Sequence, residues 1–254
     1  MVSRFLKLAR TKPRGRVVDV GWVLDADSAG FIWEAPRKVS RPAGQSTHAK
    51  GVDSCPAVND HLSRLLEIPC PIDLNIGFRL EGEAVRLVDL SGDSSTIRPQ
   101  HLGRMCKLAN RSEWRHPARP ILQIATPYVF LADEPVWMTQ LPPFNHFARP
   151  GLPGSVIGGR FPIDIWPRPL AWAFEWFDTA QPLVMRRGEP WFYLAFETMD
   201  PSRRIRPTEA ALTPALREYL DGLKGVTNYV GRTFSLFGTA QARRPDKLLT
   251  PKTR

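Results

Sequence analysis

Three side chains suited to proton transfer lie in residues 135–198, a stretch of the sequence that is rich in Trp, Pro and Gly. They are His146, Asp164 and Glu189. An imidazole or a carboxylate that lies within hydrogen-bond distance of a substrate can act as a general acid or base. The three residues are far apart along the chain, so only the fold can assemble a pair such as Asp164 with Glu175 or with Glu189. We treat His146, Asp164 and Glu189 as the candidate catalytic residues.

The same stretch also has a structural interpretation. His146 lies in the segment PFNHF beside a Gly/Pro-rich loop at 149–154, where a histidine can simply hydrogen-bond to the backbone of a rigid turn. Five of the eight tryptophans lie here, and tryptophan fills a core more often than it stacks on a nucleic-acid base. A ligand pocket would draw on Arg149, Arg160 and Trp166 beside His146. The residue types favour the structural interpretation.

No other motif adds chemistry. Ser155 lies in GLPGSVIGG, which departs from the GxSxG nucleophile elbow, and the glycines fit neither GxGxxG nor the Walker pattern. Cys55 and Cys70 each precede a proline and have no base close to them in the sequence. The five histidines are scattered, without HxH or HExxH spacing, so we expect no metal site and no cofactor.

The positive charge is concentrated at the two ends of the chain. The net charge is +10, and the segments 1–16 and 243–254 supply all of it, because the 24 basic residues between them are balanced by 24 acidic ones. Such arms can release counterions from phosphates, or they can be solvated tails. The candidates for contact with an anionic partner are Arg4, Lys7, Arg10, Lys12, Arg14, Arg16, Arg243, Arg244 and Lys247.

Strand patterns dominate the first 200 residues. Alternation over 72–80 predicts a half-buried strand that is followed by an antiparallel partner near 85–88, and 121–139 predicts two strands with a bend. We expect a hairpin from 17–24 and 31–33, and another antiparallel pair from 183–187 and 191–196. Trp172, Phe174 and Trp176 would share one strand face.

Helical signals are few. Asn59 or Asp60 can cap a short helix that carries Leu62, Leu65 and Leu66. A second helix would begin after Thr213, bury leucines and a tyrosine on one face, and end at Gly225. The predicted organisation is a basic arm (1–16), a β-rich domain (17–200), a helix-containing extension (201–240) and a basic tail (241–254). The fold class is mainly β (α+β): an antiparallel sandwich or barrel with one or two short helices and flexible basic termini.

The location of the protein follows from what the sequence lacks. Residues 1–16 have no continuous apolar block of the kind found in a signal peptide, and no window is apolar for the length that a bilayer requires. Three cysteines without a CxxC pair predict reduced thiols rather than disulfides. We expect a cytoplasmic protein, with the virion as the other location considered.

Four segments carry a resemblance to a known group. The residues CPA at 55–57, IPCPIDL at 68–74, the block 137–143 and RGEPWF at 187–192 resemble a family of uncharacterised proteins from tailed phages and bacteria. The likeness covers roughly 17–200. It implies a phage-linked context and brings no activity.

The order of motifs in the second half is similar to another architecture. A Pro–Gly loop, the Gly158–Gly159 turn, Asp164 and the RGE at 187–189 resemble the closing half of dUTPase and dCTP-deaminase β-clip domains. The likeness implies a β-clip-like fold. The Ser-Gly phosphate loop of those enzymes is not found here, so it does not imply their activity. A cupin-like barrel is the other candidate, although the histidine cluster of cupins is missing.

Two functions follow as expectations. The first is a non-enzymatic binding or structural assembly protein whose basic arms contact nucleic acid, an acidic protein surface or neighbouring subunits, and which can form oligomers. The second is an enzyme acting on a nucleotide or 2-oxoglutarate-type substrate in a β-barrel pocket. The missing catalytic motifs favour the first.

Overall fold

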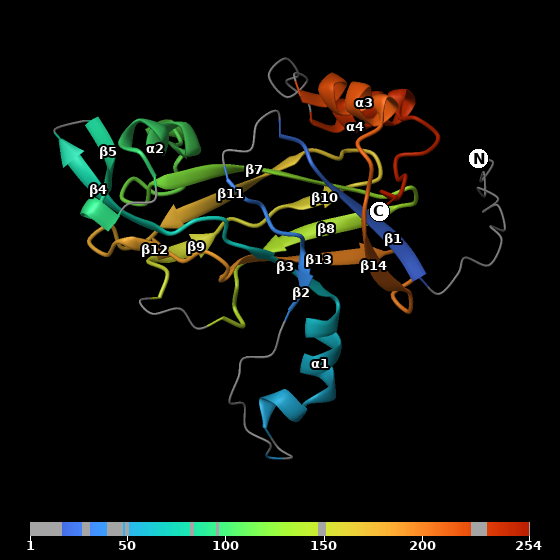
Figure 1. Cartoon of the computed structure of the whole chain (residues 1–254), viewed down its shortest axis with the longest axis horizontal. Helices are drawn as coiled ribbons and strands as arrows, with labels where there is room; N and C mark the ends of the chain where they lie inside the picture. The colour runs from blue at the N-terminus through green and yellow to red at the C-terminus, as the bar shows by residue number, and fades with distance from the viewer. Residues whose placement is uncertain are drawn as a thin grey trace, which may run out of the picture.

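The computed structural model describes residues 17–26, 31–39, 48, 51–81, 84–94, 97–146, 151–224 and 233–253. Within these residues the protein is mainly β, with three sheets and four short α-helices (Figure 1). No described helix has both the length and the apolar character needed to cross a membrane.

The largest sheet has six strands, in the order β14-β1-β7-β11-β9, with β6 beside β7. β1 pairs in parallel with β14 and antiparallel with β7. The strands are β1 (Val17–Leu24), β6 (Cys106–Leu108), β7 (Ile121–Leu131), β9 (Gly154–Val156), β11 (Pro169–Trp176) and β14 (Arg204–Glu209).

The other two sheets complete the β architecture. The five-stranded sheet has the order β10-β8-β13-β3-β2, so β2 is an edge strand. Its strands are β2 (Arg37–Lys38), β3 (Leu65–Pro69), β8 (Val136–Leu141), β10 (Arg160–Pro162) and β13 (Pro190–Thr198). The three-stranded sheet, in the order β12-β4-β5, contains β4 (Leu74–Glu81), β5 (Ala84–Asp89) and β12 (Leu183–Met185).

Two hydrophobic cores hold the molecule together. The larger core is formed by inward side chains of all three sheets, and Trp172, Phe174 and Trp176 of β11 are completely buried in it. In the smaller core, Val129 and Leu131 of β7 pack with α3 (Pro214–Lys224), α4 (Thr233–Arg243) and the segment after α4. Helix α1 (Pro56–Ser63) extends away from the sheets and α2 (Pro99–Met105) follows β5 (Figure 1). Short 3₁₀ turns lie at Val52–Ser54, Gly92–Ser94 and Arg111–Glu113.

Several sequence predictions are confirmed. β4 and β5 pair antiparallel, β7 and β8 are separated by a bend, and Trp172, Phe174 and Trp176 share a buried face. α3 begins as predicted, because the Thr213 hydroxyl accepts a hydrogen bond from the backbone N–H of Leu216. The three cysteines are free thiols.

Three local predictions are wrong. Residues 31–33 form no strand, because Trp33 instead packs its ring against Tyr128 and Trp191. The first helix starts earlier, at Pro56, and ends at Ser63, so Leu65 and Leu66 belong to β3, a strand buried along its whole length. β12 and β13 do not pair with each other, since β12 joins β4 whereas β13 lies between β3 and β8.

The C-terminal tail is not free. After α4, Leu248 and Leu249 are buried, and both backbone N–H groups donate to the Asp133 carboxylate. The Arg244 guanidinium donates to the carbonyl oxygens of Asp164, Ala132 and Asp133. The expected flexible segment therefore packs on the body through residue 252. The N-terminal arm, 1–16, lies outside the described residues.

Candidate functional site

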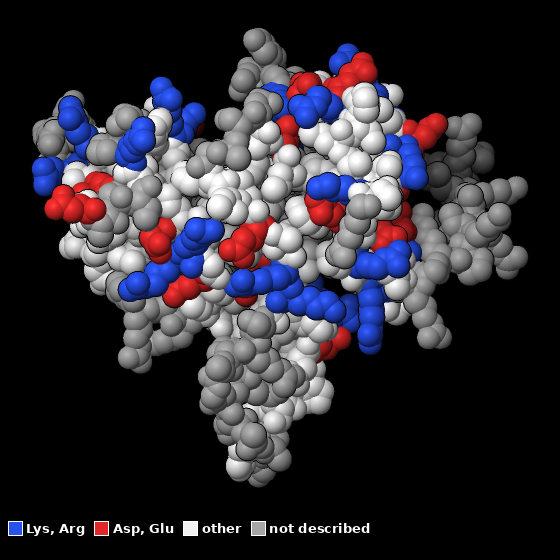
Figure 2. Space-filling model, viewed as in Figure 1, with Lys and Arg blue, Asp and Glu red and all other residues white. Residues whose placement is uncertain are grey.

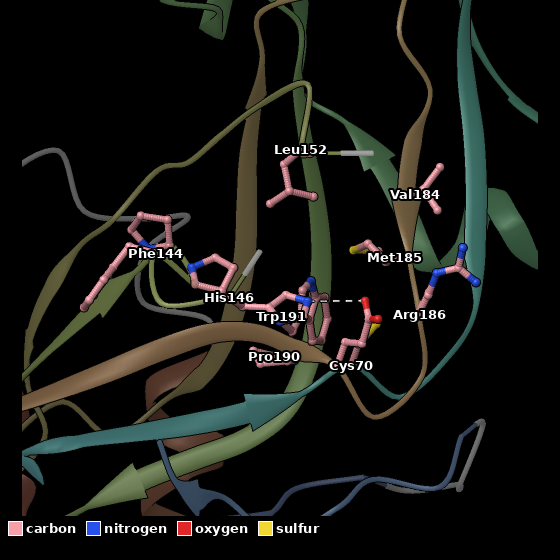
Figure 3. Close-up of a pocket in the computed structure, with 13 residues that line it drawn as sticks. Cys70, Phe144, His146, Leu152, Val184, Met185, Arg186, Pro190 and Trp191 are labelled. Carbon is pink, nitrogen blue, oxygen red and sulfur yellow. Dashed lines mark ion pairs between the residues drawn. The ribbon is translucent and has the colours of Figure 1, made fainter. Parts of the chain in front are cut away.

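A cavity of about 550 Å³ opens where a loop after β8, the end of β12 and the turn before β13 meet (Figure 3). In this view Phe144 and His146 lie across the cavity from Val184 and Met185. Its walls are mainly apolar and are formed by Cys70, Pro142, Pro143, Phe144, His146, Gly151, Leu152, Val184, Met185, Arg186, Glu189, Pro190 and Trp191. This size and character are typical of small-molecule sites.

His146 is held by a tight turn. Two prolines follow β8, and their fixed φ angles restrict the backbone. The N–H of Phe144 donates to the Pro142 carbonyl at 2.8 Å, and the N–H of His146 donates to the Pro143 carbonyl at 2.9 Å. The Phe144 ring meets Tyr193 edge-on, 5.3 Å between centroids. The loop therefore presents His146 without help from a ligand.

Glu189 is positioned by a second turn, which is anchored to Cys70. Gly188 has φ of 80°, a conformation that favours glycine. Its N–H donates to the Cys70 carbonyl at 2.8 Å, and the Cys70 N–H donates to the Glu189 carbonyl at 2.8 Å. The Arg37 guanidinium also donates to the Gly188 carbonyl at 2.7 Å. Two segments far apart in the sequence, at Arg37 and at Cys70, therefore fix this turn.

These two turns bring His146 and Glu189 together. The His146 Nε2 and Glu189 Oε2 atoms are 3.4 Å apart, the ion pair drawn dashed in Figure 3. The alignment is not that of a hydrogen bond, so the buried Nε2 has no hydrogen-bond partner among the described residues. The side chains are 24% and 37% exposed, which leaves the pair accessible from the cavity. A ligand group can therefore reach the Glu189 carboxylate, whereas the Nε2 atom of His146 is buried.

Cys70 lines the cavity but is not suited to act as a nucleophile. Its thiol is buried and donates to the Ile72 carbonyl at 3.1 Å. Burial raises the pKa of this thiol to about 12, and the nearby negative charges of Asp73 and Glu189 act in the same direction. Because the thiolate is the reactive form, Cys70 is inert at neutral pH.

Trp191 forms part of the cavity wall. Its ring stacks on Trp33, 6.4 Å between centroids, and tilts against Trp172 at 5.6 Å. Its indole N–H is buried and has no acceptor among the described residues. This N–H is therefore shielded from the solvent in the cavity, and Trp191 contributes other atoms of its side chain to the wall.

Asp164, the third predicted catalytic residue, is not in this cavity. It lines a separate hollow beside Trp137 and Phe237, where Arg244 donates to its backbone carbonyl at 2.6 Å. Burial raises the pKa of its carboxyl group. Glu175 lies elsewhere again and is paired with Arg115. The structure thus unites His146 with Glu189 and separates both from Asp164.

The predicted pocket residues have other roles. Arg160 pairs with Glu197 at 2.7 Å and lies over the Trp137 ring, and Trp166 is buried against Phe237 in the smaller core. Arg149 lies outside the described residues, as do the six basic residues of the N-terminal arm. At the other end, Arg243 and Lys247 are exposed, whereas Arg244 is engaged within the protein.

The sequence interpretation missed Cys70, Met185 and Trp191 as cavity residues. Cys70 precedes a proline and has no base nearby in the sequence, and only the fold places it against the Glu189 turn. A signal was present in the Gly188–Glu189–Pro190 turn, of which Glu189 and Pro190 line the cavity.

No group of three metal-binding side chains comes together anywhere in the described part of the chain. Comparisons with protein-family models, curated proteins and solved structures find no match to this chain.

Proposed function

We propose that this is a binding protein that holds a small, flat ligand in the cavity between Phe144, Trp191 and Met185. The observation that carries the proposal is the cavity itself: about 550 Å³, mainly apolar walls and one polar pair, His146 with Glu189. Apolar walls supply affinity, and a few placed polar groups supply orientation. The proposal keeps the non-enzymatic expectation and moves its site from the chain ends to the cavity.

The polar groups define the ligand. The Glu189 carboxylate accepts hydrogen bonds, so it favours a donor such as an amide or amino group. The Arg186 guanidinium points away from His146 in Figure 3, so it does not direct an anion to the centre of the cavity. The ligand is therefore an aromatic or heteroaromatic ring that carries a hydrogen-bond donor.

The enzymatic alternative would use the same pair of residues. His146 and Glu189 can act as general acid and base on a nucleotide or 2-oxoglutarate-type substrate. What supports binding over turnover is the neutral thiol of Cys70 and the separate position of Asp164. Phage-linked assembly through the N-terminal arm is a further prediction, which light scattering before and after removal of residues 1–16 would test.

The test compares benzamide, benzoate and toluene by saturation-transfer NMR on the full chain. Benzamide carries both a donor and an acceptor, benzoate only acceptors, and toluene neither. We expect benzamide to bind best, by roughly tenfold over benzoate, which is the order of one hydrogen bond to a charged group. Glu189→Gln should reduce this preference, and Trp191→Phe, which removes part of the cavity wall, should weaken the binding of all three probes.

The matched control is Trp172→Phe, which makes the same change in a tryptophan that does not line the cavity. It should leave the order of the probes unchanged. If no probe binds, or if the order survives in Glu189→Gln, the proposed site is wrong. Turnover of a nucleotide or of 2-oxoglutarate that is lost in His146→Ala would favour the enzyme instead.

A further inference from the structure

Outside the cavity, exposed basic side chains from four segments gather along the β2 edge of the five-stranded sheet. In Figure 2, Lys and Arg side chains follow one another across the lower part of the view, above the projecting α1. We call this surface the basic band, and it consists of Arg37, Lys38, Arg64, Arg186, Arg187 and Arg204.

Direct contacts show that the band is continuous. Arg37 donates to the carbonyl of Gly188, the residue after Arg186 and Arg187. Lys38 follows Arg37 on β2, where it pairs with Leu66, two residues from Arg64.

The chain of contacts continues to the largest sheet. Arg64 donates to the Pro201 carbonyl at 3.0 Å and to the Asp60 carboxylate at 2.9 Å. Arg204 interacts electrostatically with the same carboxylate and pairs in β14 with Val17 of β1.

Acidic groups also lie in the band, including the exposed Asp73, whose carboxylate accepts a hydrogen bond from the backbone N–H of Arg187 at 3.0 Å. Arg37 binds the buried carboxylate of Glu67 at 2.5 Å, and Arg64 holds Asp60 through two hydrogen bonds. Lys38, Arg186, Arg187 and Arg204 form no ion pair with any described residue, and all four are exposed. These four positive charges therefore face solvent, and among them Arg204 also interacts electrostatically with the Asp60 carboxylate.

We infer that the basic band binds the sugar–phosphate backbone of a nucleic acid without reading its sequence. A row of cations along a sheet edge matches a linear polyanion better than a compact acidic patch. Three of the four unpaired cations are arginines, whose planar guanidinium groups suit phosphate. The segment 1–16, which carries six further basic residues, joins the body at Val17, opposite Arg204. This inference does not depend on the ligand of the cavity.

The experiment measures fluorescence anisotropy of a labelled 20-nucleotide oligo-dT and of a 20-base-pair duplex from 50 to 200 mM NaCl. The full chain is compared with K38A/R186A/R187A/R204A. Each phosphate contact contributes about 0.7 to the salt slope for a single strand, so the slope should fall by about 3. Affinity at 50 mM NaCl should fall at least about tenfold.

The matched control is R119A/R160A/R243A/K252A, which removes four cations from other elements and reaches the same net charge. It should bind nearly as tightly as the unaltered protein. Equal losses in both variants would show that only net charge matters, and that result would overturn the inference. Unchanged binding in the band variant would overturn it too, as would poly-glutamate competing as well as oligo-dT at equal charge.

Two double variants guard against misfolding. K38A/R204A and R186A/R187A should each lose about half of the slope change while keeping the melting temperature of the unaltered protein. K38A/R204A contains no cavity residue, so it should still bind benzamide. Failure of the band and failure of the cavity are therefore separable.

Discussion

Two aromatic regions come from the same stretch of the chain, 135–198, yet one is filled and the other is hollow. In the filled region, Trp172 and Phe174 stack with centroids 5.0 Å apart, and Trp176 closes the row. In the hollow region, Phe144, His146 and Trp191 surround a cavity of about 550 Å³. Composition does not distinguish them.

The backbone makes the difference. β11 lies between β7 and β9, so its alternate side chains point together into the core. Part of the cavity wall is instead formed by turns that satisfy their own backbone hydrogen bonds, such as Gly188 with Cys70. Regular pairing therefore produces packing, and self-supporting turns leave space for a ligand.

The largest expected effect is in the filled region. Trp172→Ala removes a completely buried ring, and we expect the free energy of unfolding to fall by about 3–5 kcal/mol. Urea titration followed by circular dichroism measures this change. A loss below about 1 kcal/mol would mean that the row of aromatic rings is not well packed.

At Cys70, which lies at the boundary between the two regions, we expect an effect on stability of intermediate size. Its pKa of about 12 in the folded protein lies above the ordinary value of 9.0, so the folded state holds its proton more tightly than the unfolded state. Stability from this thiol is complete below about pH 9 and is lost as the pH rises toward 12. Melting temperatures between pH 8 and 11 should fall less in Cys70→Ala than in the unaltered protein.

Alkylation gives the complementary measurement. With that pKa, only about one ten-thousandth of Cys70 is thiolate at pH 8. Iodoacetamide should therefore label the half-buried Cys55 well before Cys70, as followed by mass spectrometry of peptides. Equal rates would show that the cavity admits water to the thiol.

The smallest effect on stability is expected at the cavity mouth. Phe144 is 53% exposed, so Phe144→Ala should lower the free energy of unfolding by only about 1 kcal/mol, the contribution of its ring pair with Tyr193. The same variant should weaken the binding of benzamide several-fold in the NMR assay. A large loss of stability with unchanged probe binding would reverse the contrast between the two regions.

Sequence patterns predicted the elements that carry their own periodicity. The alternation in β4, the shared face of Trp172, Phe174 and Trp176, and the capped start of α3 all follow from local rules. Sequence patterns failed to predict the segments that are buried on every side. β3 has no alternation because all five of its residues are buried. From the sequence pattern alone, Leu65 and Leu66 therefore fit a helix as well as a strand.

The candidate site divides in the same way. Residue type alone identified His146 and Glu189 as groups able to exchange protons, and the Gly188 turn was visible in the sequence. Only the tertiary structure decided that these two meet while Asp164 does not, and that Arg244 holds the C-terminal segment to the body. Side-chain chemistry and local periodicity belong to the residues themselves, whereas proximity depends on which strands pair, and β12 and β13 join different sheets.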